Sequence, residues 1–239
     1  MADGAAWNIF CDFDGTIARE DVTDSLLEVF APVQWREIEA EWREGRIGSR
    51  ECLVRQVALL RCTPSKLDTL LESVAVDPHF ADFVRFCRSR SVRLTVVSDG
   101  FDLAIRSILG RKGLGLLPIV SNHLEYLGAE RWRLVFRNAR ERCSVQSGTC
   151  KCDAMRRRSR GGPALLIGDG ASDFCAAASA DFVFAKDALL DHCRRLGHPH
   201  AAFSNFREVR ALLASLLEPP ASGECAPLQL ATREITVDG

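Results

Sequence analysis

Two aspartates, Asp12 and Asp14, stand two residues apart where the first apolar run of the chain ends. Alternate side chains of an extended strand point to the same side, so both carboxylates are expected to face one site. Asp169 and Asp173 follow another apolar run and supply two more carboxylates. Carboxylates held this close repel one another, and a divalent cation with oxygen ligands relieves the repulsion. The four aspartates therefore predict a metal site, with Mg2+ as the expected ion.

A second set of residues is suited to holding phosphate. Ser98 offers a hydroxyl and Lys151 an ammonium, while Gly15 and Gly100 let backbone N–H groups approach an anion closely. A cation, an ammonium, a hydroxyl and exposed amides together make a phosphate-binding site. A carboxylate inside such a site can attack phosphorus and form an aspartyl-phosphate, so Asp12 is a candidate nucleophile.

Three apolar segments, at residues 8–11, 92–97 and 164–167, each run into Asp, Ser or Gly. Continuous apolar segments of this kind are typical of strands buried on both faces of a parallel sheet. Helical patterns lie between them, and two more strands are expected at 181–184 and 201–203. This alternation predicts a doubly wound, Rossmann-like α/β sheet. Ligands of such sheets bind beyond the carboxyl ends of the strands, so the polar residues should converge there.

Residues 18–78 interrupt the alternation of strands and helices. Apolar residues recur there at three- and four-residue spacing, without a good strand candidate. We therefore expect a small helical insertion, or cap, at 18–78, and a discontinuous α/β core made of residues 1–17 and 79–217. Residues 218–239 are rich in Pro, Ser, Gly and Thr, which favours a flexible tail. The segment 116–136 is less regular, with candidate strands at 119–120, 124–127 and 132–136, the last two joined around Gly128.

The composition excludes several classes of protein. The chain of 239 residues is 47% hydrophobic, too apolar for a disordered chain, and no apolar run approaches the ~18 residues of a membrane helix. A net charge of −1 gives no global field that would recruit nucleic acid or a membrane surface. The first residues lack a secretion signal, so the ten cysteines indicate reduced thiols of a cytoplasmic protein. Cys143, Cys150 and Cys152 lie close together but lack the C-x2-C spacing of a common zinc site.

Four motifs occur in a recognisable order along the chain. They are Asp12–Phe13–Asp14–Gly15–Thr16, Ser98, Lys151 and Gly168–Asp169–Gly170–Ala171–Ser172–Asp173. Their order and their places at strand ends resemble the signature of the haloacid dehalogenase superfamily. The resemblance covers the chain from residue 8 to about residue 186, and it implies a phosphoric monoester hydrolase that requires Mg2+.

Residue roles follow from this resemblance. Asp12 is expected to be the nucleophile and a Mg2+ ligand. Asp14 is expected to protonate the leaving alkoxide and then deprotonate the attacking water, with its backbone carbonyl on the metal. Asp169 and Asp173 are expected to complete the metal site. The residues expected to bind the phosphate or the rest of the substrate are Ser98, Asp99, Gly100, Lys151 and Asp21.

The helical insertion resembles the cap of the phosphoserine phosphatase-like subgroup. Within this subgroup, the chain is more similar to the methionine-salvage branch that acts on 2-hydroxy-3-keto-5-methylthiopentenyl-1-phosphate. The similarity lies in Phe30–Ala31–Pro32 and Trp35 of the insertion and in Cys150–Lys151 of the third motif. The cap arginine that holds the carboxylate of phosphoserine falls on Gln56, which weakens the phosphoserine interpretation. The adjacent Arg55 would point about 100° around the helix.

The expected function is Mg2+-dependent hydrolysis of a small phosphate monoester beneath a cap that excludes bulk water and macromolecules. Phosphoserine hydrolysis is the alternative with the same chemistry. A non-catalytic ligand-binding module on the same fold is the alternative from another class, although such a module would usually lack Asp12 or Asp14. The sequence leaves the exact substrate and the oligomeric state open.

Overall fold

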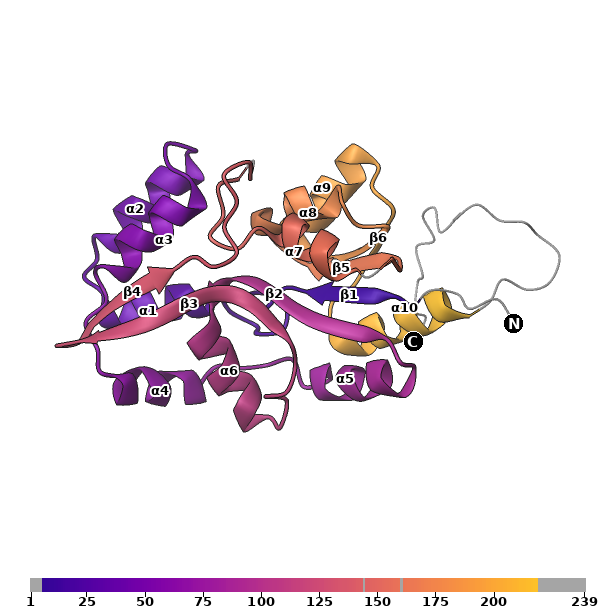
Figure 1. The fold of residues 1–239 in the computed structure, drawn as a ribbon, viewed down its shortest axis with the longest axis horizontal. Helices are drawn as coiled ribbons and strands as arrows, with labels where there is room; N and C mark the ends of the chain where they lie inside the picture. The colour runs from indigo at the N-terminus through magenta and orange to yellow at the C-terminus, as the bar shows by residue number, and fades with distance from the viewer. Residues whose placement is uncertain (1–5, 144, 160, 219–239) are drawn as a thin grey trace.

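The computed structural model describes residues 6–143, 145–159 and 161–218. Its centre is a seven-stranded sheet in the order β4-β3-β2-β1-β5-β6-β7 (Figure 1). The chain begins at the middle strand, adds strands on one side and then on the other, which is the doubly wound arrangement. The predicted fold class is confirmed. The strands are β1 Asn8–Cys11, β2 Arg93–Phe101, β3 Ile119–Gly128, β4 Arg131–Val135, β5 Ala164–Gly168, β6 Phe182–Ala185 and β7 His200–Ala202.

Helices cover both faces of the sheet (Figure 1). In β1, Ile9 and Cys11 join the core beneath one layer of helices, while Phe10 between them joins the core beneath the other. Both faces of the strand are therefore buried, which explains its unbroken apolar sequence. One layer consists of α5 Phe80–Ser89, α6 Asp102–Arg111 and α10 Phe206–Leu217, and the other of α7 Lys151–Arg158, α8 Phe174–Ala177 and α9 Asp187–Leu196.

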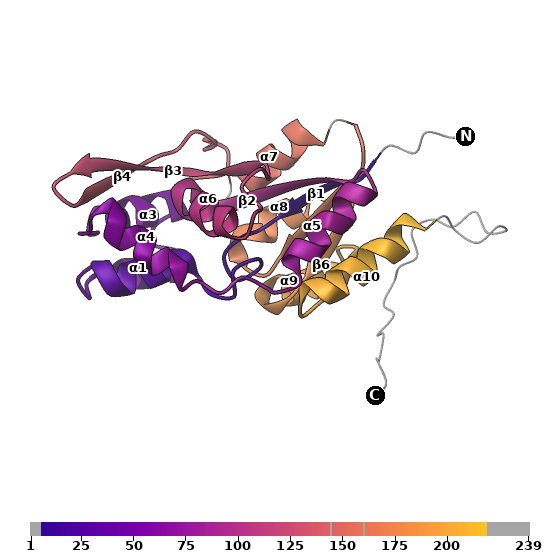
Figure 2. The same cartoon turned by 90° about the horizontal axis from the view of Figure 1, so that it is seen from below.

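The segment 116–136 supplies β3 and β4, which form a hairpin. Strand β4 pairs antiparallel with β3, so the sheet is mostly rather than wholly parallel. The hairpin extends beyond the rest of the sheet and lies beside the helices that follow β1 (Figure 2). The Trp132 indole N–H on β4 donates to the Cys62 carbonyl at 2.9 Å, which ties the hairpin to that helical segment.

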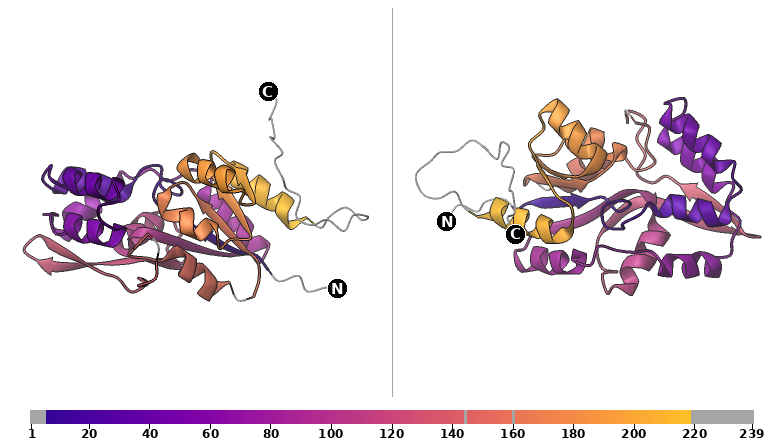
Figure 3. Two further views of the ribbon diagram at one scale, coloured as in Figure 1. Left: turned by 90° about the horizontal axis from the view of Figure 1, so that it is seen from above. Right: turned by 180° about the vertical axis from the view of Figure 1, so that it is seen from behind.

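Four helices follow β1 at one end of the molecule (Figure 3). Asp21 caps the first by accepting a hydrogen bond from the Asp24 N–H at 2.9 Å, and Thr63 caps the fourth, which has Pro64 in its first turn. We refer to these helices as the cap. They are α1 Val22–Phe30, α2 Trp35–Arg43, α3 Ser49–Val57 and α4 Pro64–Glu72.

The predicted flexible tail at 218–239 falls, apart from its first residue, outside the described residues. Before it, Asn205 caps α10 by accepting hydrogen bonds from the N–H groups of Arg207 and Glu208. Among the helices of the described ranges, none combines the length and the apolar character needed to cross a membrane.

Candidate active site

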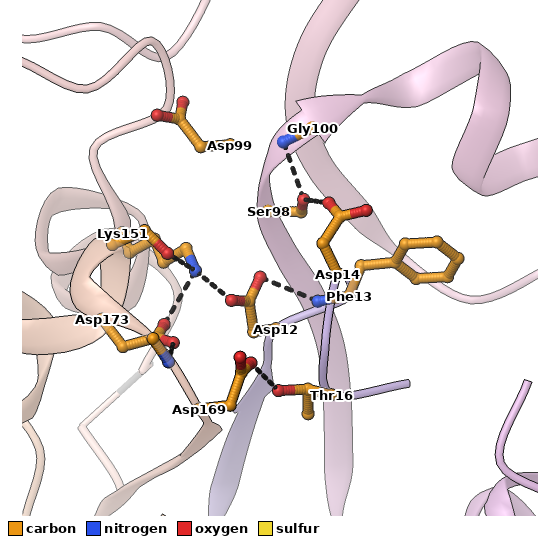
Figure 4. Close-up of polar contacts among 12 residues, drawn as sticks. Asp12, Phe13, Asp14, Thr16, Ser98, Asp99, Gly100, Lys151, Asp169 and Asp173 are labelled. Atoms are coloured by element: carbon orange, nitrogen blue, oxygen red, sulfur yellow. Dashed lines mark hydrogen bonds and ion pairs between the residues drawn. The ribbon is translucent and has the colours of Figure 1, made fainter. Parts of the chain in front are cut away.

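The carboxyl ends of neighbouring parallel strands bring the polar motifs together (Figure 4). Cys11, the last residue of β1, is in register with Val96 of β2 and Ile167 of β5. Asp12 continues directly from β1, and its N–H donates to the Ile167 carbonyl at 2.9 Å. Ser98 near the end of β2 and the motif that follows β5 therefore lie beside Asp12. Residues more than 150 positions apart in the sequence share one site because the strands before them are neighbours.

Lys151 is the centre of a buried charged network. Its side chain is 2% exposed, and its ammonium lies 2.6 Å from Asp12 Oδ2, 2.7 Å from Asp173 Oδ1 and 2.9 Å from Ser172 Oγ. Burial acts to lower the pKa of Lys151, but the two carboxylates outweigh it and raise the pKa. Burial also raises the pKa of Asp12 well above its usual range, and the negative charge of Asp173 adds to this. The network is therefore short of positive charge.

Asp14 and Ser98 form the neighbouring part of the site. Asp14 Oδ1 accepts a hydrogen bond from the Val22 N–H at 3.0 Å, and Oδ2 accepts one from the Ser98 hydroxyl at 3.1 Å. The Gly100 N–H donates to Ser98 Oγ at 2.8 Å, and a Cβ at Gly100 would lie 2.5 Å from Asp14 Oδ2. Burial raises the pKa of Asp14 to about 7, with the charge of Asp21 adding to it. A carboxyl group that titrates near neutrality is suited to giving and taking a proton.

Asp12, Asp169 and Asp173 make up the candidate metal site. One carboxylate oxygen from each lies within 4.8 Å of the other two. Their three negative charges against the one positive charge of Lys151 leave an excess of two, which a divalent cation would balance. An all-oxygen set of donors fits Mg2+. The side chain of Asp14 is not part of this group, so only its backbone carbonyl remains as the expected contact with the metal.

Two residues for which no role was predicted, Thr16 and Gly170, support the metal site. The Thr16 hydroxyl donates to Asp169 Oδ1, and the Gly170 N–H donates to Asp173 Oδ2 at 3.4 Å where the short 3-10 helix η1 Ala171–Asp173 begins. Gly15 has a left-handed φ of 68°, and a Cβ there would lie 2.4 Å from Asp169 Oδ2. The close approach of the two motifs therefore explains the glycine that follows Asp14.

Asp99, expected among the residues that bind the phosphate or the rest of the substrate, lines the same cavity as Asp12 and Asp14. Its carboxylate points away from Asp12 (Figure 4). Asp99 Oδ1 accepts hydrogen bonds from the Thr149 N–H at 2.7 Å and from Asn122 Nδ2 at 3.0 Å, and the Thr149 hydroxyl donates to Asn122 Oδ1 at 3.0 Å. Thr149 lies two residues before Lys151, and its backbone N–H has Asp99 as its acceptor. Asp99 therefore fixes the segment that carries Lys151.

The cap closes the other side of a cavity of about 210 Å³ whose floor is the motif site. Its described lining residues include no lysine and no arginine. Asp21, which is expected to contact the substrate, lines the cavity from the start of α1, and the other acidic residues of the cap side were not predicted. Burial raises the pKa of Asp24 to about 7, with the charges of Asp21 and Glu39 adding to it. From the cap, the cavity is lined by Asp21, Thr23, Asp24, Glu39, Trp42, Ser49, Cys52, Leu53 and Gln56.

Gln56 occupies the position at which the subgroup resemblance places an arginine. It is 2% exposed, and its amide donates to Glu39 Oε2 at 3.0 Å. Arg55 turns away from the cavity and pairs with Glu41 at 2.7 Å. The cap therefore offers no arginine to a substrate carboxylate from this helix.

Comparisons with known proteins agree with this geometry. The 2-hydroxy-3-keto-5-methylthiopentenyl-1-phosphate phosphatases of Brevibacillus brevis and Geobacillus kaustophilus are each 33% identical to the chain, over 86% and 84% of it and 94% and 92% of their own lengths. A substrate-bound structure of phosphoserine phosphatase shares the fold, with a TM-score of 0.67, 19% identity, and coverage of 87% of this chain and 98% of that one. The family model of haloacid dehalogenase-like hydrolases matches residues 9–178. The chain belongs to the haloacid dehalogenase-like hydrolase family.

Proposed function

We propose that this chain is a Mg2+-dependent phosphatase that hydrolyses a small phosphate monoester through an aspartyl-phosphate on Asp12. The observation that carries the proposal is one cavity that contains Asp12 and Asp14, with Ser98 beside Asp14 and the ammonium of Lys151 at 2.6 Å from Asp12. The names of the similar curated proteins, which are phosphatases, support the same reaction class.

Asp12 is held ready for attack on phosphorus. Its Oδ1 accepts the Phe13 N–H at 2.8 Å, and its Oδ2 contacts Lys151. The carboxylate is therefore oriented before the substrate arrives, and little rotational freedom is lost in the reaction. An oxygen of Asp12 forms the new bond to phosphorus while the bond between phosphorus and the ester oxygen breaks. Lys151 and Ser98 are placed to stabilise the charge on the phosphoryl oxygens.

Asp14 is placed to handle the proton. Its pKa of about 7 leaves a substantial protonated fraction at neutral pH, so it can give a proton to the departing alkoxide. The resulting carboxylate can then take a proton from the water that attacks the aspartyl-phosphate. The hydrogen bond from Ser98 keeps Oδ2 of Asp14 beside the phosphate position during both steps.

Asp12, Asp169 and Asp173 are the residues that would hold Mg2+, with the Asp14 carbonyl as a further ligand. When bound there, the cation supplies positive charge that neutralises the phosphoryl oxygens. Thr16 keeps Asp169 in place through its hydrogen bond to Oδ1.

The cavity also favours one class of substrate. Phosphoserine carries a carboxylate and an ammonium beside its phosphate. The acidic cap side chains suit the ammonium, but no lysine or arginine of the described lining would hold the carboxylate. An ester whose remainder carries hydroxyl, carbonyl and apolar groups meets Trp42, Leu53 and Gln56 instead. We therefore propose a small metabolite of the methionine-salvage type, 2-hydroxy-3-keto-5-methylthiopentenyl-1-phosphate being the first candidate. We further propose a cytoplasmic location, with neither nucleic acid nor membranes as partners.

The test is a comparison of phosphate esters with purified protein and Mg2+. We expect release of p-nitrophenol from p-nitrophenyl phosphate, higher kcat/KM for the salvage ester than for phosphoserine, and loss of both activities in Asp12→Asn. Unchanged hydrolysis by Asp12→Asn would refute the aspartyl-phosphate mechanism. Preference for phosphoserine would refute the substrate proposal while leaving the mechanism intact.

Beryllofluoride distinguishes an enzyme from a binding-only module, since it mimics a phosphoryl group on a carboxylate. We expect Mg2+-dependent protection of the protein from thermal unfolding by beryllofluoride, and none in Asp12→Asn. A protein that neither hydrolyses the esters nor responds to beryllofluoride would favour the ligand-binding alternative.

A further inference from the structure

A pair of thiols flanks the buried lysine of the active site. Cys150 is the N-cap residue of α7 and Cys152 is its second residue, with Lys151 between them. The two Sγ atoms lie 3.2 Å apart, in contact with one another. Cys150 is 3% exposed, whereas Cys152 is partly exposed and therefore within reach of a small oxidant. The mechanism above uses neither thiol.

The position of this pair matters because Lys151 has little freedom. Its ammonium already contacts Asp12, Asp173 and Ser172 at 2.6, 2.7 and 2.9 Å. The Cys150 carbonyl accepts the Ala154 N–H at 3.0 Å, so the residue before Lys151 also belongs to the first turn of α7. A covalent bond between the neighbours of Lys151 would close a small ring around its backbone and change the direction of its side chain.

We propose that Cys150 and Cys152 form a reversible disulfide that lowers the activity of the enzyme by displacing Lys151. A peroxide is the oxidant class. The Cys152 thiolate attacks one peroxide oxygen, forming a sulfenic acid and releasing water once the other oxygen takes up a proton. The Cys150 thiol then attacks that sulfur, a second water leaves, and the S–S bond is complete. Two thiols are oxidised and one hydrogen peroxide is reduced to two waters.

The geometry requires only a small closure. A disulfide has an S–S length of about 2.05 Å, so the sulfurs must approach by roughly 1 Å from their present contact. A displacement of about 1 Å at a catalytic group can cost on the order of 100-fold in rate. Burial raises the pKa of Cys150 to about 12 and also raises that of Cys152, so oxidation is best carried out at mildly alkaline pH, where more thiolate is present.

A zinc site is the competing use of these thiols. Cys143 lies near Cys150, and Cys175 near Cys152, so four cysteines share the region. Among the described residues, however, the only group of three ligand atoms close enough for one metal ion consists of Asp12, Asp169 and Asp173. The Sγ atoms of Cys150 and Cys152 are already in contact, which favours a disulfide between them.

The experiment treats the full chain with hydrogen peroxide at pH 8.5, removes the peroxide, and measures p-nitrophenyl phosphate hydrolysis with Mg2+ before and after dithiothreitol. We expect a loss of at least 10-fold that dithiothreitol restores, and no such loss in Cys150→Ser or Cys152→Ser. Cys143→Ser is the matched control and should remain sensitive. A loss of activity on peroxide treatment of Cys152→Ser as large as in the wild type would overturn the proposal. Zinc bound stoichiometrically by the cysteines of the untreated protein would also overturn it.

Peptide mapping identifies the bond independently of activity. Trypsin cleaves after Arg142, Lys151 and Arg156, so residues 143–151 and 152–156 separate unless a disulfide joins them. In Cys143→Ser, joined peptides assign the bond to Cys150 and Cys152, and a link from Cys152 to Cys175 would refute that assignment.

The effect on activity rests on the proposed function, so a second readout separates the two proposals. If the reduced protein hydrolyses no ester, the proposed function fails. The effect of the mapped bond on Lys151 is then measured through the affinity for inorganic phosphate, which the disulfide should weaken at least 10-fold. Equal phosphate affinity in the reduced and oxidised proteins would contradict the proposed displacement of Lys151.

Discussion

The carboxylate of Asp99 lies next to Ser98 in the sequence but acts on another segment of the chain. It accepts the Thr149 N–H at 2.7 Å and the Asn122 amide at 3.0 Å, and Thr149 precedes Lys151 by two residues. The spacing of motifs along the sequence could not show this, because the partners of Asp99 come from β3 and from the loop before α7. Only the folded arrangement separates a residue that touches phosphate from one that positions Lys151.

Replacing Asp99 tests this positioning role. Asp99→Ala removes the acceptor of the Thr149 N–H, so Lys151 loses its fixed position, and we expect kcat for p-nitrophenyl phosphate to fall about 10-fold. Asp99→Asn keeps one acceptor oxygen and should remain within about threefold of the wild type. Steady-state kinetics with Mg2+ provide the measurement. An equal fall of kcat in both variants would instead indicate that the negative charge of Asp99 itself contributes to the reaction.

Asp24 shows how the acidic cap responds to pH. Burial raises its pKa to about 7, and the charges of Asp21 and Glu39 add to this while Arg43 opposes it. An unfolded Asp titrates near 3.9. The folded chain therefore retains a proton on Asp24 that the unfolded chain has released, and the stabilisation from that proton is lost as pH rises through about 7.

Asp24→Asn cannot ionise, so its stability relative to the wild type should grow between about pH 4 and pH 7 and stay constant above. Because Asp24 is partly exposed and solvent screens its charge, we expect a gain of only ~1 kcal/mol at pH 8, or roughly 2–4 °C in Tm, and almost none at pH 4. Asp68→Asn is the control. Ser107 and Arg111 lower the pKa of Asp68, so this variant should lose stability relative to the wild type as pH rises. Thermal unfolding across this pH range measures both variants, and parallel curves for Asp24→Asn and the wild type would contradict the linkage.

At the scale of elements, helix α3 of the cap contacts the loop that leads to α7. The Arg50 N–H donates to the Gln146 carbonyl at 3.0 Å, and the Arg50 guanidinium contacts the carbonyls of Arg140 and Ser147 at 3.3 and 3.4 Å. These bonds join the cap to the loop beside the active site. They are therefore suited to holding the cap closed over a bound substrate.

Arg50→Ala should loosen this closure. Loss of the guanidinium contacts removes ~1–2 kcal/mol of closing free energy, and we expect KM to rise roughly 5- to 30-fold with a smaller change in kcat. Arg55→Ala is the matched control on the same helix, because Arg55 pairs with Glu41 at the surface and should change KM less than about twofold. Similar KM values for the two variants would exclude Arg50 from cap closure.

The elements also show what could be predicted from sequence. Strands such as β1 and β5 were predictable because burial on both faces leaves an unbroken apolar run that ends in motif residues. The join of β3 to β4 around Gly128 was predictable too, because so short a connection allows only an antiparallel pair, whereas the full length of β3 was not, because polar residues at 121–123 interrupt its apolar pattern. The placement of Asp12 beside Ser98 and Asp169 followed from strand topology, whereas the acidic side of the cavity depends on how α1 and α2 pack.

For the molecule as a whole, the decisive quantity is the charge balance where the strands meet. Three carboxylates meet at the candidate metal site, and the single ammonium of Lys151 pairs with two of them, Asp12 and Asp173. We expect the remaining repulsion to weaken the fold until a cation is present. A cation that binds only the folded chain stabilises it by about 2.7 kcal/mol at a concentration 100 times its Kd. In a chain of this size such a gain corresponds to a rise in Tm of roughly 5–10 °C.

Mg2+ should therefore raise Tm, EDTA should reverse the rise, and Asp169→Asn should abolish most of it, as scanning calorimetry can measure. In EDTA the same variant should be at least as stable as the wild type, because removing one carboxylate relieves repulsion while Asn keeps an acceptor for Thr16. This opposite sign with and without metal separates a ligand from a residue that only supports the fold, which would destabilise both states when replaced. An Asp169→Asn protein whose Tm rises with Mg2+ as much as that of the wild type would show that the cation binds elsewhere.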